Sequence, residues 1–139
     1  MNNVKKEMIQ LYKLKKLGYD FMGYTFKKPE ELSYHHLIIA KQYCKDLGLG
    51  NGVYQWNGAI LVRDTAHDYL HLIQRFDEEV FSRITQEMIE ENTSNAIKIE
   101  NLKKIRQLLL YFEHEYADIK NSKGVNAIKE EYKIKRITL

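Results

Sequence analysis

The chain is short of the residues that cross-link a fold or interrupt a helix. Its 139 residues include one cysteine, Cys44, and one proline, Pro29. A lone cysteine can form neither an internal disulfide nor a Cys-x-x-Cys zinc site, and it fits a reducing cytosol. The 44% of residues that are hydrophobic therefore have to supply the core without covalent help.

Long apolar runs are also missing. No stretch of about 18 apolar residues occurs, so the sequence predicts no membrane span. The segment Met1–Glu7 is charged and leads into no apolar signal-peptide region. We expect a cytoplasmic protein with no membrane partner.

The excess of positive charge is small, at +3. That value permits contact with nucleic acid but does not require it. Basic residues gather near the two ends of the chain, where a solvated surface and contacts to phosphate are the alternative roles. They are Lys5, Lys6, Lys13, Lys15 and Lys16, then Lys133, Lys135 and Arg136.

The length fits a single domain spanning 1–139, with helical flanks at 3–17 and 77–117. Apolar residues recur at helical spacing in Val4–Lys16, and Gly18 would end that helix. Asp77–Glu91 and Glu100–Tyr116 show the same spacing, which is typical of helices that pack on a core.

The middle of the chain predicts a strand, a loop, a second strand and a helix. Before it, Tyr19–Phe26 could run extended and Lys27–Glu30 is typical of a turn. The four elements are expected at Ser33–Ala40, at the glycine-rich stretch 46–52, at Gly58–Val62, and from an N-cap at Asp64 or Thr65 to about Arg75.

Four of the five histidines fall within this middle region. Neighbours on a strand point to opposite faces, so His35 and His36 should have different tasks. His67 and His71 are four residues apart, so on a helix they share a face and can converge on one ion. An imidazole that titrates near neutral pH and a cation beside a phosphate are what phosphodiester hydrolysis needs.

The segments Tyr34–Ile39, Trp56–Leu61 and His67–His71 together resemble the HNH endonucleases, also called the ββα-metal or His-Me finger family. More narrowly, they resemble small HNH-like proteins of Firmicutes and their phages, over a motif at 33–75. The resemblance implies an α+β fold: a ββα-metal core of a short two-stranded antiparallel sheet and a helix, packed by additional helices. It also implies a metal-dependent endonuclease that hydrolyses DNA phosphodiester bonds by a one-metal mechanism with a histidine general base.

The resemblance assigns a role to each matching residue. His36 would be the general base that activates water, and Asn57 would brace the loop and orient that base. His35 stands where the family usually has a metal-binding aspartate, and His67 matches the second metal ligand. His71 is an additional candidate, for the metal or for a phosphate oxygen. Beside the motif, we expect Arg63 to grip the nucleic-acid backbone.

Two departures from the family pattern bear on the cofactor. The family implies one divalent ion, Mg²⁺ or Mn²⁺, with Ni²⁺ or Zn²⁺ as alternatives. Neutral His35 in place of an aspartate weakens the binding of a hard ion such as Mg²⁺ and favours the binding of borderline metals. The paired cysteines that brace many HNH proteins with zinc are absent, so packed helices would have to hold the motif.

Two other functions fit the same residues. The chain could be a catalytically silent HNH-like binding protein, such as a phage-encoded inhibitor of a host defence system, with a protein partner in place of DNA. Alternatively, His36, His67 and His71 could hold a structural zinc ion without catalysis.

Overall fold

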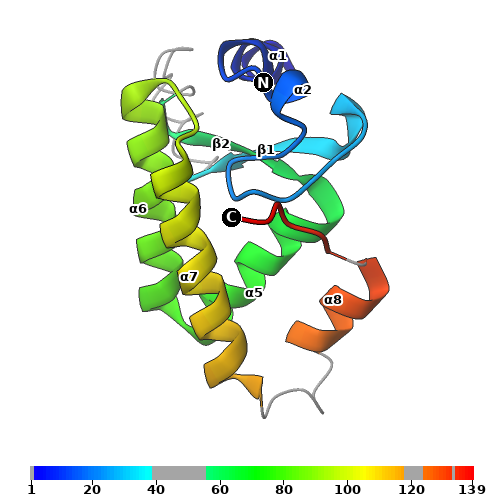
Figure 1. Cartoon of the computed structure of the whole chain (residues 1–139), viewed down its shortest axis with the longest axis vertical. Helices are drawn as coiled ribbons and strands as arrows, with labels where there is room; N and C mark the ends of the chain where they lie inside the picture. Colours follow the sequence, from blue (N-terminus) through cyan, green and yellow to red (C-terminus); the bar gives the residue numbers. More distant parts are fainter. Residues whose placement is uncertain (1, 39–55, 118–123, 133) are drawn as a thin grey trace, which may run out of the picture.

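A short antiparallel sheet surrounded by helices forms the fold (Figure 1). The computed structural model describes residues 2–38, 56–117, 124–132 and 134–139; Cys44 and the predicted loop 46–52 lie outside them. The N-terminal half contains α1 (Asn2–Leu11), α2 (Leu14–Leu17), the 3₁₀ turn η1 (Pro29–Glu31), β1 (Leu32–His36), β2 (Gly58–Val62) and the π-helical turn η2 (Arg63–His67). The rest contains α5 (Asp68–Phe76), α6 (Glu78–Ser94), α7 (Ile99–Glu115) and α8 (Val125–Tyr132). The expected α+β class with a two-stranded antiparallel sheet is confirmed.

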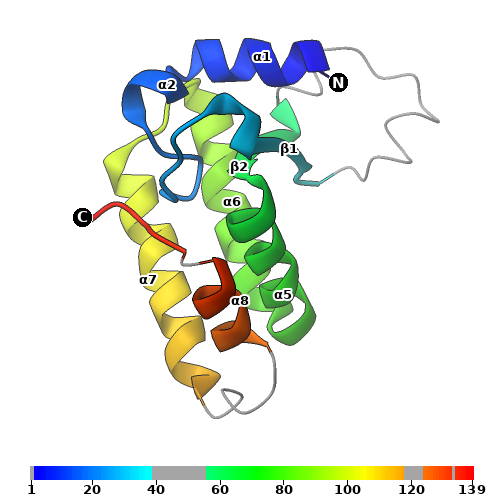
Figure 2. The ribbon, with the colours of Figure 1, turned by 90° about the vertical axis from the view of Figure 1, so that its right-hand side faces the viewer.

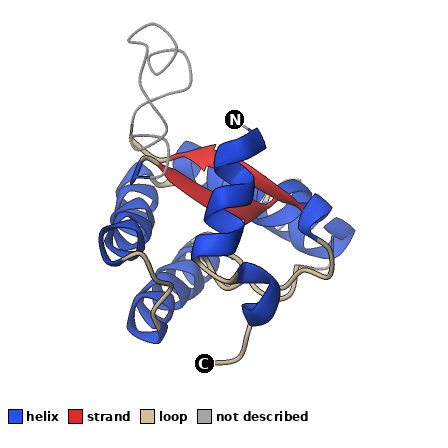
Figure 3. Ribbon diagram, turned by 90° about the horizontal axis from the view of Figure 1, so that it is seen from above, coloured by secondary structure: helices blue, strands red, loops and turns tan. Residues whose placement is uncertain are grey.

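The two strands pair in a register that runs from Leu32 opposite Val62 to His36 opposite Gly58. Every residue of β2 is buried. The reason is visible in Figures 2 and 3: α1 crosses over one face of the sheet, and α5, α6 and α7 lie on its other side. A strand covered on both faces needs a continuous apolar run, which Gly58–Val62 supplies.

The helix expected over Val4–Lys16 is in fact two helices. α1 ends at Leu11, and α2 begins only after Lys13, which has a left-handed backbone conformation with φ 56°. Tyr12, beside the break, is buried and donates a hydrogen bond of 2.7 Å from its hydroxyl to Asn92 Oδ1 on α6. Helical spacing in the sequence could not show this break, because the buried positions keep the same apolar character across it.

Other boundaries also differ from the sequence-based expectations. Tyr19–Phe26 contains only single bridges, Tyr19 with Thr25 and Tyr24 with Arg136, and no strand. The helix after β2 begins at Arg63 without a side-chain cap, so neither Asp64 nor Thr65 is its N-cap. α8 was not expected at all. α6 and α7 occupy the expected range 77–117.

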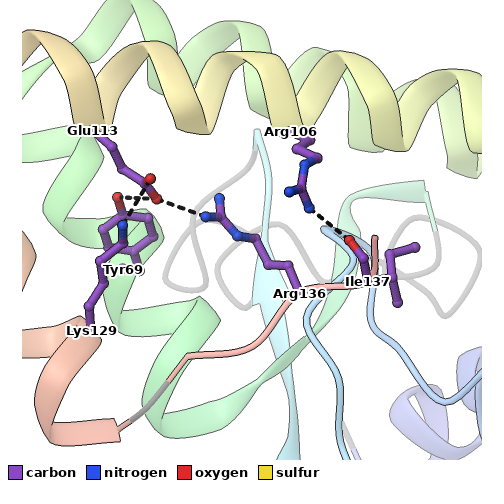
Figure 4. Close-up of polar contacts among 6 residues, drawn as sticks. All are labelled: Tyr69, Arg106, Glu113, Lys129, Arg136 and Ile137. Carbon is purple, nitrogen blue, oxygen red and sulfur yellow. Dashed lines mark hydrogen bonds and ion pairs between the residues drawn. The ribbon is translucent and has the colours of Figure 1, made fainter. Parts of the chain in front are cut away.

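The C-terminal segment runs back against the N-terminal part of the chain. Ile137 donates its backbone N–H to Gly23 O, and Thr25 donates to Lys135 O. Arg106 on α7 donates to the carbonyl of Ile137 at 2.8 Å (Figure 4). These contacts fix the segment 134–139 between α7 and the loop that precedes β1.

Glu113 on α7 ties three parts of the molecule together (Figure 4). Its carboxylate forms ion pairs with Lys129 of α8 at 2.9 Å and with Arg136 at 3.0 Å. It also accepts a hydrogen bond of 3.2 Å from the hydroxyl of Tyr69 on α5.

Of the helices that the structure describes, none combines the length and the apolar character that crossing a bilayer requires.

Candidate metal centre

Three histidines meet where β1 faces the helix that follows β2. His35 comes from β1, His67 is the last residue of η2, and His71 lies one turn further on, in α5. One ring nitrogen from each of the three lies within 4.8 Å of the others. The three residues are therefore close enough together to bind a metal ion.

The local fold explains why they converge. Strand alternation sends His35 to the same face as Ser33, and its cross-strand partner is the small, buried Ala59. The four-residue spacing of His67 and His71 stacks their rings, with centroids 4.9 Å apart. The π-helical turn places His67 beside the strand, in a type of distortion that is frequent at functional sites.

A chain of hydrogen bonds fixes the tautomer of His67. The hydroxyl of Ser33 lies 3.3 Å from the carbonyl oxygen of Leu61, which can only accept, so the hydroxyl donates there. The contact of 3.0 Å between Ser33 Oγ and His67 Nδ1 then requires that Nδ1–H donates. The lone pair of His67 is therefore on Nε2, which lies 2.9 Å from His35 Nδ1.

Burial favours the neutral form of His35 and of His67. It lowers the pKa of His35 to about 3, and the neighbouring His67 and His71 lower it in the same direction. Burial, and then the charge of His71, also lower the pKa of His67. Neutral imidazole is the form that binds metals, so at neutral pH no proton has to leave these two rings before a cation enters.

The donor set fits a cation. Two nitrogens bound to one ion at about 2.1 Å in tetrahedral geometry are about 3.4 Å apart, so a pair at the 4.8 Å limit has to close by about 1.4 Å. His71 is exposed and can make that adjustment. His35 is 5% exposed, and among the described residues nothing hydrogen-bonds to its Nε2. A buried imidazole that is only half satisfied is unusual unless a ligand completes it.

His36 does not belong to this group of three. It follows His35 on the strand, so it points to the other face, where its ring meets the ring of Tyr34 edge-on at 4.8 Å. It is nevertheless near: its charge contributes to lowering the pKa of both His35 and His67. The structure thus separates the residue expected as a base from those expected as ligands.

Asn57 closes the connection between the strands. Its side-chain oxygen accepts a hydrogen bond of 2.8 Å from the backbone N–H of Ile38. Its backbone carbonyl accepts one of 2.7 Å from Leu37. These bonds hold the backbone next to His36.

Arg63 lies at the first position of η2 and is exposed. One guanidinium nitrogen, Nη2, is 3.5 Å from the carbonyl oxygen of Leu32, at the start of β1. The arginine is thus tethered at the end of the sheet away from His36 and Gly58, where it remains open to solvent.

Sequence reasoning missed three polar residues that support the site. Ser33 could have been found, because it is two residues before His35 and so shares its face. Asp20 is fully buried and accepts backbone hydrogen bonds from Met22, Tyr24 and Val62, the last at 2.9 Å. Asn92 donates to Gly58 O at 2.6 Å. Nothing local in the sequence marks Asp20 or Asn92, because their partners are distant along the chain.

Comparison of the chain with models of protein families, with curated proteins and with solved structures gives no match.

Proposed function

We propose that this protein is a metal-dependent endonuclease of the HNH type, acting on the phosphodiester bonds of DNA. The observation that carries the proposal is the group of three histidines, one on a strand and two on the helical segment that follows the second strand, which lie close enough together to hold a single cation. A strand–strand–helix unit that presents such ligands is the arrangement implied by the HNH-like segments of the sequence.

The three imidazoles also bear on the metal. Nitrogen ligands suit Zn²⁺, Ni²⁺ and Mn²⁺ better than Mg²⁺, which prefers oxygen. We therefore expect His35, His67 and His71 to hold one of these borderline ions. When bound, such an ion supplies positive charge that offsets the charge of the phosphate and of the departing oxygen.

The proposed chemistry uses His36 as the base. Its imidazole takes a proton from water, the water oxygen forms a bond to phosphorus, and the bond from phosphorus to the 3′ oxygen breaks. Asn57 holds the backbone at Leu37 and Ile38 and so keeps His36 in place. Arg63, exposed at the end of the sheet, binds a phosphate on the same strand.

One observation favours a second function. His36 lies on the face of β1 opposite to the three histidines, against Tyr34. If that face is never in contact with substrate, the same fold serves as a metal-stabilised binding protein without catalysis. This is the silent HNH-like module, with a protein partner in place of DNA.

Cleavage of supercoiled plasmid by purified protein tests the first function. The reactions contain Zn²⁺, Ni²⁺, Mn²⁺, Mg²⁺ or EDTA, and the protein is wild type, His36→Ala or His67→Ala. His114→Ala is the matched control, because His114 is exposed on α7. We expect nicking that needs metal, is lost in the first two variants by about 10²-fold or more, and persists in the control.

Binding of metal is measured separately, by thermal unfolding of the same proteins. A metal at 100 times its dissociation constant adds about 2.7 kcal/mol to the stability of the wild type, and His67→Ala should lose this gain. Metal-dependent stabilisation without any nicking would support the silent binding protein. Absence of both effects would remove the proposed centre altogether.

A further inference from the structure

A groove lies beside the N-terminal helices, on a part of the molecule that the proposed chemistry does not use. It has a volume of about 680 Å³. Its walls come from α1, the α1–α2 junction, α2 and η1. They are formed by Lys6, Ile9, Gln10, Lys13, Lys15, Lys16, Pro29 and Glu30.

The groove is strongly basic for its size. Four of its lining residues are exposed lysines, and Glu30 is the only acid among them. Among the described residues, none of these four lysines forms an ion pair with another described residue. Between the lysines lie Ile9, which is 8% exposed, and the half-buried Pro29, which give the groove an apolar floor.

The break between α1 and α2 creates this arrangement. Lys13 has φ 56° and ψ 41°, a left-handed conformation that only glycine adopts without strain. The turn brings the lysines of α2 to the same groove as Lys6 of α1. Strained backbone that the surrounding structure maintains clusters at active sites, ligand-binding segments and switch regions.

Positive charge continues from the groove toward the histidines. Lys5, the neighbour of Lys6, is near enough to Arg63 for the arginine charge to lower its pKa, after the larger effect of burial. Arg63 in turn contacts the carbonyl of Leu32. Glu30 in the groove wall and His35 are five positions apart in the sequence, a length of chain that spans at most about 18 Å.

We propose that this groove binds the phosphodiester backbone of a nucleic-acid strand and leads it past Lys5 and Arg63 to the three histidines. The direction of the path rests on the proposed function, because that function places a phosphate at the histidines. An extended polyanion can follow a line of separated charges, whereas a flat membrane surface cannot enter a hollow. An acidic peptide would neutralise the lysines but has no phosphate to offer the histidines.

Binding of a short fluorescent single strand and of the matching duplex, measured by anisotropy in EDTA, tests this inference. The variant Lys6→Gln/Lys13→Asn/Lys16→Gln removes three groove charges, and asparagine tolerates the left-handed conformation at position 13. Lys98→Gln/Lys103→Gln/Lys104→Gln is the matched control, because it removes three exposed charges from the start of α7.

We expect the groove variant to bind at least about tenfold more weakly at low salt, and the control to bind like the wild type. The slope of log affinity against log salt should become shallower by about 0.7 on a single strand, and by about 0.9 on a duplex, for each phosphate that the variant no longer neutralises. The charge-retaining variant Lys6→Arg/Lys16→Arg should bind like the wild type. Circular dichroism checks that each variant is folded.

Several results would overturn the inference. One is equal weakening in the groove variant and in the control. Another is binding of polyglutamate or of phosphatidylserine vesicles as tightly as DNA, since the groove would then attract any polyanion. A third is normal DNA binding by the groove variant.

Hydrolysis of bis(p-nitrophenyl) phosphate with added metal separates this inference from the proposed function, because so small a substrate does not need the groove. If the wild type hydrolyses this substrate but the groove variant binds DNA normally, only the groove inference is wrong. If the groove variant loses DNA binding and the wild type does not hydrolyse the substrate, the groove inference is supported and the proposed nuclease activity is wrong.

Discussion

At the scale of single residues, the most informative side chain is that of Ser33, which is not one of the three histidines but contacts one of them. Ser33 accepts a hydrogen bond from His67 and donates its own hydroxyl proton to the carbonyl of Leu61, which leaves the lone pair of His67 directed at the neighbouring histidine. Partners of this kind fix the tautomer and the orientation of metal ligands. The serine thus decides which nitrogen of His67 carries the lone pair.

We expect Ser33→Ala to lower the affinity for Zn²⁺ or Ni²⁺ by about 10- to 100-fold while the fold is retained. Without the hydroxyl, the ring of His67 is free to rotate and to change tautomer. Isothermal titration calorimetry measures the affinity, and Ser94→Ala, at an exposed serine of α6, is the control. Unchanged affinity in Ser33→Ala would show that His67 does not bind the metal through Nε2.

Gly58 is a second residue whose role depends on a single contact. The ring of Tyr34 lies directly over it, and a Cβ at this position would overlap the ring. We expect Gly58→Ala to cost about 1–3 kcal/mol of stability, since either the tyrosine or the strand has to move. Urea unfolding measures the loss. It should shrink in a Tyr34→Ala background, and an equal loss there would mean that the tyrosine is not the cause.

At the scale of elements, α6 carries an acid where the helix needs an apolar residue. Glu91 is completely buried, and among the described residues neither of its carboxylate oxygens has a hydrogen-bond partner. Burial raises its pKa well above the usual value, and the nearby charges of Asp20 and Glu87 raise it further. Asp20 shows the same effect, with a pKa that burial raises to about 7 against the pull of four backbone amides.

The raised pKa of Glu91 predicts how stability depends on pH. The folded state holds this proton at pH values where the unfolded state has lost it, so stability is greatest below about pH 4.5 and falls as pH rises toward the folded-state pKa. Glu91→Gln removes this decline. The free energy of unfolding of Glu91→Gln, relative to that of the wild type, should grow by up to about 1.4 kcal/mol for each pH unit above about 4.5.

Urea unfolding between about pH 4 and pH 8 measures this difference. Glu90→Gln, at an exposed position one residue earlier, is the matched control and should show no such trend. A Glu91→Gln protein that loses stability with rising pH as steeply as the wild type would assign the decline to another group, with Asp20 the next candidate.

At the scale of the whole molecule, α5, the helix that carries His71, is held by a cluster of polar side chains around Glu113. This cluster joins segments that are distant in the sequence. Tyr69 of α5 donates to Glu113, which also pairs with Lys129 and Arg136 (Figure 4). The side chains of Glu113 and Arg136 are only 14% and 15% exposed, so their charges are poorly screened. The cluster therefore links α5, α7, α8 and the C-terminal segment.

We expect Glu113→Ala to cost about 2–4 kcal/mol, because it leaves two cations and a buried hydroxyl without their acceptor. Thermal unfolding measures the loss, and limited proteolysis should cut between α8 and residue 139 sooner than in the wild type. Glu100→Ala, at an exposed position of α7, should change neither measurement. A fully stable Glu113→Ala protein would mean that apolar packing alone holds the C-terminal segment.

Much of this architecture could be predicted because its signals are local. Alternation along β1, the apolar run of β2 and the four-residue spacing of His67 and His71 all follow from the geometry of one element. The break at Lys13, the π-helical turn and α8 could not be predicted in this way. They depend on partners such as Asn92 and Glu113, which are distant along the chain from the segments they hold.

The isolated β-bridge between Tyr24 and Arg136 can form only late in the synthesis of the chain. During synthesis Arg136 is the 65th residue that the ribosome adds after His71, and reaching it takes about 3–13 s at usual rates of translation. For that interval, the histidines have been made but the cluster around Glu113 cannot close. The nascent chain therefore contains the three histidines well before this cluster can hold α5 in place.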